Sequence, residues 1–461
     1  METGHAKGPR MTAAQTMARA VEQSASVAEV LMGPGVLDQA GALFRRNFGL
    51  GPACLLADDA TWAAAGEKVQ SALMQAGVAS RVHVFPSVPR LKPTLDLAQE
   101  IASILARDGS TPVAIGSGVL NDVVKHAAFS LSRPYLCVAT AASMDGYSSA
   151  GAPLSVKGFK MTIACRPAKA ILADFDVICK APREMTGWGY GDLAGKVPAG
   201  ADWILADALG IEAIDPAVWP MVQGDLRAWL SQPMAVASGD RQAIEGLFAG
   251  LTLVGLAMER HGTSRPASGA DHQIAHLWEM DDLHFGGERV SHGACVAVGC
   301  VMTLRLWDWL LAQDLAQLEI DALVAAAPDM DAKTKMIQHA FGNTEIAARS
   351  IEETRAKQKT AAELRARLTS LVAQWPNLRR RLSDHLMPAD QMCAALHKAG
   401  APSDASQIGV SQGNLRRTLL SARFLRSRYT VLDVLEETGL LNRAVDAALD
   451  AQSQRPPSNQ E

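Results

Sequence analysis

The sequence predicts an α/β fold with a parallel sheet in its N-terminal part, followed by an all-helical C-terminal part. Up to about residue 181, short apolar runs alternate with amphipathic stretches of helical length, which is the pattern of βαβ units. Beyond Pro182 the apolar residues recur with a period near 3.6 almost to Leu449, which is typical of helices. We therefore expect a domain boundary at Pro182.

The chain is expected to have four parts. Residues 1–20 are polar and rich in glycine and alanine, which predicts a flexible N-terminus. Residues 21–181 form the predicted α/β domain, and residues 182–450 the predicted helical domain. Residues 451–461 are rich in serine, proline and glutamine, so we expect a disordered tail.

Composition excludes several classes of protein. A formal net charge of −4 and a pI near 6.3 give no bulk attraction to nucleic acid or to an anionic membrane. The longest apolar runs are shorter than the ~20 residues that span a bilayer, and no secretory segment opens the chain, so we expect a cytoplasmic protein. The seven cysteines are scattered and form no CxxC pair, which argues against a disulfide framework and a thiolate zinc cluster.

The strands of the sheet are predicted from short, continuous apolar runs, because parallel strands are buried on both faces. A first strand begins near Val27, and the others cover residues 53–57, 81–85, 112–115, 135–139 and 170–177. Helices are expected after Gly35 and over residues 61–75, 93–105 and 120–130. This alternation predicts helices on a parallel sheet.

Gly116, Ser117 and Gly118 follow the apolar run at residues 112–115 and lead into the predicted helix at Leu120. Backbone N–H groups at such a helix start can hold a phosphate. The GxGxxG fingerprint is incomplete because Asn121 stands at its last position, and a simple strand-to-helix turn explains these glycines about equally well.

Ligands of open α/β sheets bind beyond the carboxyl ends of the strands. Asp58, the turn at residues 116–118 and the segment Thr140–Ser149 all lie at such ends. Asp58 is therefore a candidate acceptor for ribose hydroxyls, a role that favours the unphosphorylated dinucleotide NAD. The alternative is that Asp58 caps a helix.

Histidine is scarce, with 11 in 461 residues, yet His272, His276 and His292 lie close together in the sequence. Residues four apart on a helix share a face, so His272 and His276 can reach one small volume, and His292 begins a second apolar run. Imidazole is the commonest protein ligand for ions such as zinc. Each histidine alone is more often structural, but together they predict a metal or catalytic site.

The segment from Leu415 to Asn442 begins with several arginines. Because the chain has no overall positive charge, we interpret these arginines as solvated helix faces or as helix-to-helix pairs rather than a nucleic-acid patch.

Five motifs occur in a fixed order: GSGxxND from Gly116, TAASxDG from Thr140, GYGDLxxK from Gly189, SGADHxxxH from Ser268 and HGxxVxxG from His292. In combination they resemble the sn-glycerol-1-phosphate dehydrogenase family, within the larger group of iron-type alcohol dehydrogenases, glycerol dehydrogenase and dehydroquinate synthase. The resemblance extends from about Leu55 to Leu441.

The resemblance implies an N-terminal Rossmann-like domain, a C-terminal helical domain and an active site in the cleft between them. It also implies NAD(P)H-dependent, reversible reduction of dihydroxyacetone phosphate to sn-glycerol 1-phosphate, one divalent metal ion, a place in phospholipid metabolism and a homodimer or larger homo-oligomer. The implied metal ligands are Asp192, His272 and His292. Asp145 and His276 are implied to be catalytic and, with Asp192, to contact the substrate. The implied cofactor-binding residues are Asp58, Gly116, Ser117, Gly118, Asp122, Thr140, Ser143 and Ser149.

One carboxylate and two imidazoles leave open positions on an ion, as catalytic sites require, and they suit zinc or nickel equally. Two features leave the substrate open: Met144 in the second motif, and a run of acids from Glu279 to Glu288 that disfavours a strongly cationic phosphate pocket nearby. The alternatives are a lyase like dehydroquinate synthase, a dehydrogenase of another small polyol or sugar phosphate, and a non-catalytic nucleotide-binding or scaffold protein.

Overall fold

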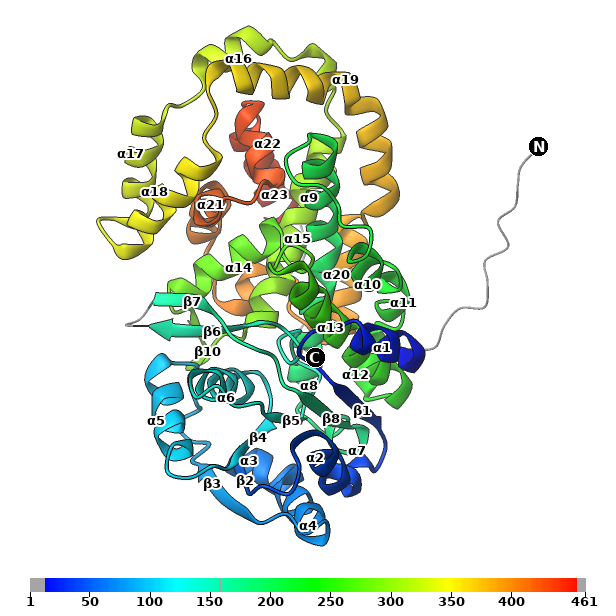
Figure 1. Cartoon of the computed structure of the whole chain (residues 1–461). Helices are drawn as coiled ribbons and strands as arrows, with labels where there is room; N and C mark the ends of the chain where they lie inside the picture. Colours follow the sequence, from blue (N-terminus) through cyan, green and yellow to red (C-terminus); the bar gives the residue numbers. More distant parts are fainter. Residues whose placement is uncertain (1–12, 157–158, 454–461) are drawn as a thin grey trace, which may run out of the picture. The chain divides into compact units, whose positions relative to one another are not determined.

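The computed structural model describes residues 13–156 and 159–453, and the chain divides into two compact units (Figure 1). Unit 1 contains residues 1–154, 162–181 and 239–262, and unit 2 contains residues 155–161, 182–238 and 263–461. Residues 239–262, which we expected in the helical domain, thus group with the N-terminal part.

Unit 1 is built on a six-stranded sheet whose strands are all parallel, as the sequence predicts (Figure 1). The strand order is β1-β8-β5-β4-β2-β3. The strands are β1 (Glu29–Gly33), β2 (Ala53–Asp58), β3 (Ser80–Phe85), β4 (Thr111–Gly116), β5 (Leu136–Ala139) and β8 (Ala170–Asp174). The prediction that β8 continues to residue 177 was wrong, because Asp174 caps the short helix α7 (Phe175–Ile178) by accepting the backbone N–H of Asp176.

Helices cover both faces of the sheet. One face packs against η1 (Val36–Gln39), α2 (Ala40–Phe48) and α4 (Glu67–Gln75), which share a core with alternate residues of β2, β4, β5 and β8. The other strand-to-strand crossovers run through α5 (Leu95–Leu105) and α6 (Gly118–Ser130), which pack on each other. Residues 59–75 form α3 (Asp59–Thr61), a π-helical turn (Trp62–Gly66) and α4. Residues 13–20, which we expected to be flexible, belong to helix α1 (Ala13–Glu22), and residues 1–12 lie outside the described part.

Near the carboxyl edge of the sheet lie one element that the sequence analysis did not predict and one helix that it placed in the helical domain. An antiparallel ribbon joins β6 (Gly151–Val156) to β7 (Phe159–Ala164). Helix α13 (Arg241–His261) belongs to unit 1 because it packs tightly on the segment before this ribbon. A Cβ on Gly255 would lie 2.2 Å from Ser148 Oγ, and that hydroxyl donates to the carbonyl of Thr252 at 2.7 Å.

Unit 2 is almost wholly helical, as predicted. Its long apolar helix α15 (His292–Leu311) has 16 buried residues and packs against several of the other helices.

Helices α13 and α15 are long and apolar enough to cross a bilayer, but 67% and 83% of their apolar windows are buried within the protein, as in core helices. The remaining elements are α8 (Arg183–Ala194), α9 (Lys196–Ala208), α10 (Trp219–Gln223), α11 (Leu226–Trp229), α12 (Pro233–Ser238), α14 (Ala270–Met280), β9 (His284–Phe285), β10 (Glu288–Arg289), η3 (Leu315–Gln317), α16 (Ile320–Ala326), α17 (Met330–Phe341), α18 (Glu345–Lys357), α19 (Ala361–His385), α20 (Ala389–Lys398), η4 (Ala405–Ile408), α21 (Gln412–Ser421), η5 (Ala422–Leu425), α22 (Val431–Glu437) and α23 (Leu441–Ser453).

Candidate functional site

Three helices of unit 2 bring the predicted metal ligands together. Asp192 lies near the end of α8, His272 in the first turn of α14, and His292 at the first residue of α15. One ligand atom from each lies within 4.8 Å of the others, and His272 Nε2 is 3.6 Å from Asp192 Oδ1. The Asp192 side chain is fully buried, whereas the His292 side chain is 28% exposed, so solvent reaches this set of residues at His292.

Glycines explain why these helices approach so closely. A Cβ on Gly191 of α8 would lie 2.8 Å from the carbonyl oxygen of Gly293 in α15. A Cβ on Gly299 of α15 would lie 2.4 Å from the carbonyl oxygen of Asp271 in α14. Any side chain at these positions would push apart the helices that carry the three ligands.

Each imidazole of the set is held by a carboxylate of its own. His272 Nδ1 is 2.5 Å from Asp271 Oδ2, and His292 Nδ1 is 2.9 Å from Glu279 Oε1. A carboxylate accepts the proton of Nδ1, so the lone pair of each ring lies on Nε2. For His272 this is the nitrogen that approaches Asp192. The donor set is therefore a carboxylate with two imidazole nitrogens, which suits a divalent transition-metal ion.

Asp192 also contacts Lys196, whose Nζ donates to Asp192 Oδ1 at 2.7 Å. Both side chains are completely buried. Burial alone would raise the pKa of Asp192, but the charge of Lys196 and the contacts with His272 and His292 outweigh it and hold that pKa below its ordinary value. For His272 burial acts to lower the pKa, and the carboxylates of Asp271 and Asp192 outweigh it, so the pKa is raised.

The start of α14 is fixed by Asp202 of α9, which the sequence analysis did not single out. Asp202 is fully buried, and its two oxygens accept the backbone N–H groups of Ala270 at 2.7 Å and Val431 at 2.9 Å. Ala270 begins α14 and Val431 begins α22. One carboxylate thus joins two helix starts that lie far apart in the sequence.

His276, predicted to be catalytic, completes a cluster of three imidazoles. Its ring centroid is 5.9 Å from that of His272 and 5.7 Å from that of His292. Its side chain is 22% exposed, more than that of His272. His276, Glu279 and His292 form a second group whose ligand atoms lie within 4.8 Å of one another.

Arginines balance the acidic run that follows this cluster. Arg417 pairs with Asp281, and Arg289 Nε lies 3.2 Å from Asp282 Oδ1. Arg289 also donates to the carbonyl oxygen of Glu279 at 3.3 Å. The run therefore carries less negative charge than its sequence suggests, which weakens the argument against a phosphorylated substrate.

The predicted cofactor residues lie in unit 1. Asp58 ends β2 and Gly116 ends the neighbouring strand β4. From β2 the chain crosses to β3 on one side of the sheet, whereas from β4 it crosses to β5 on the other side. Asp58 and Gly116 therefore flank the topological switch point of the sheet. Dinucleotides bind at such points. Thr140 follows β5 and donates its N–H to the carbonyl of Gly116 at 3.2 Å.

Lys125 of α6 organises the loop after β5, and the sequence analysis missed it. Its side chain is completely buried, and Nζ donates to the carbonyls of Gly146 at 2.6 Å and Gly151 at 2.9 Å. The same ammonium lies 3.4 Å from Asp122 Oδ1 and from Ser149 Oγ. The sequence did contain a signal: Lys125 lies one turn after Asp122, on the buried side of an apolar helix. An unpaired buried lysine is energetically costly, so its position implies that partners lie nearby.

Other predicted residues of unit 1 have structural partners. Asp58 accepts the N–H of Thr61 at 2.8 Å in a capping box, which is the alternative that the sequence left open. Met144 packs against the turn, because a Cβ on Gly118 would lie 3.3 Å from its Cγ. Asp145 is half-buried in the same loop, Gly118 begins α6 directly after Ser117, and Ser143 is buried. Their roles toward a cofactor or substrate remain predictions.

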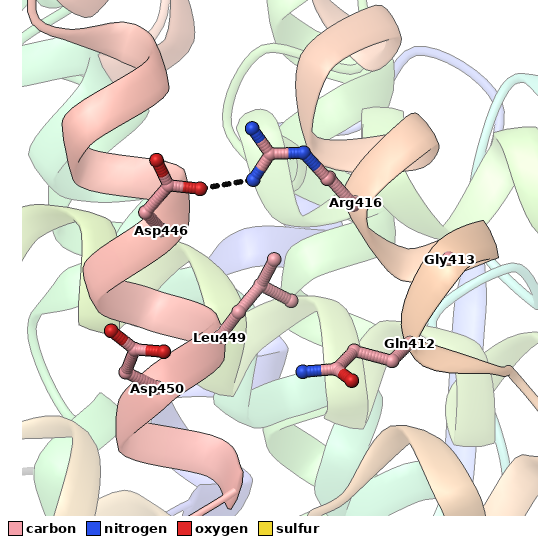
Figure 2. A pocket seen from close by; sticks show the side chains of 6 residues that line it. All are labelled: Gln412, Gly413, Arg416, Asp446, Leu449 and Asp450. Atoms are coloured by element: carbon pink, nitrogen blue, oxygen red, sulfur yellow. Dashed lines mark hydrogen bonds and ion pairs between the residues drawn. The ribbon is translucent and has the colours of Figure 1, made fainter.

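A surface hollow of about 470 Å³ lies between α21 and α23 and contains no predicted site residue (Figure 2). Figure 2 shows Arg416 of α21 paired with Asp446 of α23 at its edge. Arg423 likewise pairs with Glu436 of α22 at 2.9 Å. These contacts confirm that arginines of this segment join helices. The lining residues are Gln412, Gly413, Arg416, Asp446, Leu449 and Asp450.

Residues 31–182 match the family described as iron-containing alcohol dehydrogenase. The glycerol-1-phosphate dehydrogenase [NAD(P)+] of Bacillus subtilis is 30% identical over 390 residues, which cover 84% of this chain and 86% of that protein. The enzyme of the same name from Bacillus licheniformis is 28% identical over 424 residues, covering 91% and 92%.

Solved structures support the fold. The structure of glycerol dehydrogenase from Schizosaccharomyces pombe superimposes with a TM-score of 0.58 and 16% identity, covering 95% of each chain. An NADH-dependent butanol dehydrogenase from Thermotoga maritima gives a TM-score of 0.58 at 13% identity, covering 91% of this chain and 96% of that one. With the sequence match over most of its length and the architecture in agreement, this chain belongs to the glycerol-1-phosphate dehydrogenase family, within the iron-containing alcohol dehydrogenases.

Proposed function

We propose that this chain reduces dihydroxyacetone phosphate to sn-glycerol 1-phosphate, reversibly, with NADH or NADPH and one divalent metal ion. The reaction class is that of the family: the chain is an NAD(P)-dependent dehydrogenase that acts on a CH–OH group. The observation that carries the metal dependence is the convergence of Asp192, His272 and His292 within 4.8 Å. The phosphorylated ketone as substrate is supported by the names of the relatives.

The residues present fit a metal ion. Asp192, His272 and His292 would hold it, and Asp271 and Glu279 direct the imidazole lone pairs through Nδ1. When bound, such an ion polarises a carbonyl oxygen and stabilises negative charge there, while NAD(P)H supplies hydride. Zinc and nickel both suit this donor set.

The chain's own groups have separate tasks in this proposal. His276, in the same imidazole cluster and partly exposed, holds a proton that it can give to the oxygen of the reduced substrate. In unit 1, the backbone N–H groups after Gly116 hold the pyrophosphate, with Ser117, Gly118, Asp122, Thr140, Ser143 and Ser149 around it. Asp58 accepts the ribose hydroxyls and Asp145 contacts the substrate. A cytoplasmic homodimer or larger homo-oligomer, and a role in phospholipid metabolism, complete the proposal.

The test is a spectrophotometric assay at 340 nm with protein that has been stripped of metal and reloaded with zinc or nickel. We expect NADH or NADPH oxidation with dihydroxyacetone phosphate, and little with dihydroxyacetone, which lacks the phosphate. Asp192→Ala should abolish both metal retention and turnover, since it removes the only charged ligand. Asp446→Ala is the matched control, because its carboxylate pairs with exposed Arg416 outside the site.

Three outcomes would contradict the proposal. An Asp192→Ala protein with full metal content and turnover would remove the metal site. Equal activity on dihydroxyacetone would point to an unphosphorylated polyol. A reaction in which the cofactor shows no net oxidation would favour a lyase, because such an enzyme regenerates its cofactor in every turnover.

A further inference from the structure

Helix α14 carries more than the two histidines of its sequence motif. His272, His276 and Glu279 are spaced four and then three residues apart, so all three project from one face of the helix. Glu279 occupies the last turn, and its side chain is only 4% exposed. The family motif of the sequence ends at His276 and gives Glu279 no role.

The position of Glu279 is unfavourable by local rules. A carboxylate in the last turn of a helix faces the negative end of the helix dipole. Burial adds a desolvation penalty unless the charge is well partnered. Such departures from local preference concentrate at functional sites, so the partners of Glu279 are informative.

Those partners are two imidazoles with different predicted tasks. Glu279 Oε1 is 2.9 Å from Nδ1 of His292, a metal ligand of the proposed site. Glu279 Oε2 is 4.0 Å from Nε2 of His276, the proposed proton donor. The rings of His276 and His292 are nearly parallel, with an angle of 24° and centroids 5.7 Å apart, and the carboxylate reaches both.

We propose that Glu279 is a positioning residue that fixes two groups at once: the metal-binding face of His292 and the orientation of His276. By accepting the Nδ1 proton of His292, it keeps the lone pair on Nε2 and fixes the rotation of the ring. With its second oxygen, 4.0 Å from His276 Nε2, Glu279 holds the His276 ring next to His292. The inference rests on the proposed function and extends the role of Glu279 from His292 to His276.

Asp271 performs the first of these tasks for His272, but it contacts one ring of the site only, through Nδ1 at 2.5 Å. Glu279 is therefore expected to differ from Asp271 in a measurable way. Loss of Asp271 should weaken metal binding, whereas loss of Glu279 should weaken metal binding and also impair proton transfer at His276.

The first experiment measures zinc affinity by competition with a chromophoric chelator, using full-length protein and zinc alone. Loss of an outer partner of a metal-bound histidine costs about 10–100-fold in affinity, and we expect this range for Glu279→Leu. Glu279→Gln keeps the volume and an accepting oxygen, so its loss should be smaller. Glu288→Gln, an exposed carboxylate in β10, is the control and should bind zinc like the parent. If Glu279→Leu does not fold, the Gln variant carries the test, and parental zinc affinity in every folded Glu279 variant would overturn the proposal.

The second experiment separates positioning from ligation. Because His276, Glu279 and His292 also lie close enough to be ligands, a second ion is the rival explanation. We expect one zinc per chain, and we expect His276→Asn to retain parental zinc affinity while it lowers turnover. Two zinc ions per chain, with one lost in both His276→Asn and Glu279→Gln, would make Glu279 a ligand and overturn the positioning role.

The readouts also distinguish this inference from the proposed function. If zinc binding depends on Glu279 but dihydroxyacetone phosphate is not reduced, the substrate assignment fails and the positioning role stands. If dihydroxyacetone phosphate is reduced and the Glu279 variants keep parental zinc affinity and parental kcat, the positioning role fails and the substrate assignment stands.

Discussion

Gly299 offers the sharpest test of how the proposed metal centre is assembled. A Cβ at this position would lie 2.4 Å from the carbonyl oxygen of Asp271, about 1 Å short of ordinary contact. The backbone carbonyl of Asp271 cannot rotate away as a side chain can, so Gly299→Ala must move α15 and α14 apart near His272. Overpacking of this kind costs about 1–3 kcal/mol, of which the helix preference of alanine over glycine offsets about 0.5–1 kcal/mol.

The metal centre should respond more strongly than the fold. The displaced carbonyl belongs to the residue whose side chain holds His272, so we expect zinc affinity to fall roughly 10–100-fold, as when an outer partner is lost. Denaturant unfolding of the metal-free protein measures the first effect, and chelator competition measures the second. Gly413→Ala in α21 is the matched control: a Cβ there meets nothing within 4 Å, so only the helix preference of alanine acts, and stability should rise by at most about 0.5–1 kcal/mol.

The refuting result is a Gly299→Ala protein with parental stability and parental zinc affinity. It would mean that α14 and α15 can separate by this distance without moving the ligands, and that the close approach of the helices does not define the site. Loss of stability with unchanged zinc affinity would refute the second step alone.

Three further variants test buried contacts. Lys125→Met removes the ammonium that donates to the carbonyls of Gly146 and Gly151 and leaves them only the longer contacts from Ser149, so we expect a loss of about 1–3 kcal/mol in unfolding free energy and weaker cofactor binding in a fluorescence titration. Parental values for both would contradict the role of Lys125. Burial raises the pKa of Asp202 from 3.8 to about 7, so the stability that the protonated side chain provides is complete below about pH 4 and is lost as the pH rises through 7. The unfolding free energy of Asp202→Asn should lack this dependence on pH. A variant with the same pH profile as the parent would contradict the role of Asp202. Asp58→Asn keeps an oxygen for the helix cap but loses the charge that would bind the ribose. The unfolding free energy should therefore change by less than about 0.5 kcal/mol, while the affinity for NADH falls. Unchanged NADH affinity would mean that Asp58 only caps the helix.

The sheet could be predicted because its signal is local. Each strand is buried on both faces and is therefore a continuous apolar run, and the alternation with helices implies parallel pairing. The strand order and the ribbon β6–β7 could not be predicted in this way, since β6 has half-buried residues and no apolar run marks it. Helix α13 was recognised as a helix, but its membership of unit 1 depends on the contact between Gly255 and Ser148, which are distant in the sequence.

The candidate metal ligands, which the fold brings together, were proposed in part from residue spacing and in part only from resemblance. The spacing of His272 and His276 on one helix face follows from helical geometry. Asp192 lies 80 residues earlier, and only the family motif linked it to the histidines. Asp202 and Lys125 escaped notice, and Glu279 was interpreted only as part of an acidic run, because charged residues usually lie at the surface. Only the fold shows that these three are buried.

The double contact of Asp202 has a consequence for biosynthesis. Its carboxylate holds the start of α14 together with Val431, so the helix that carries His272 is fully anchored only after nearly all of the chain has been made. A nascent chain that ends before Val431 leaves one oxygen of this buried carboxylate without its partner. Stable loading with an ion should therefore follow release from the ribosome, and C-terminal truncations should copurify with little metal even when their parallel sheet has formed.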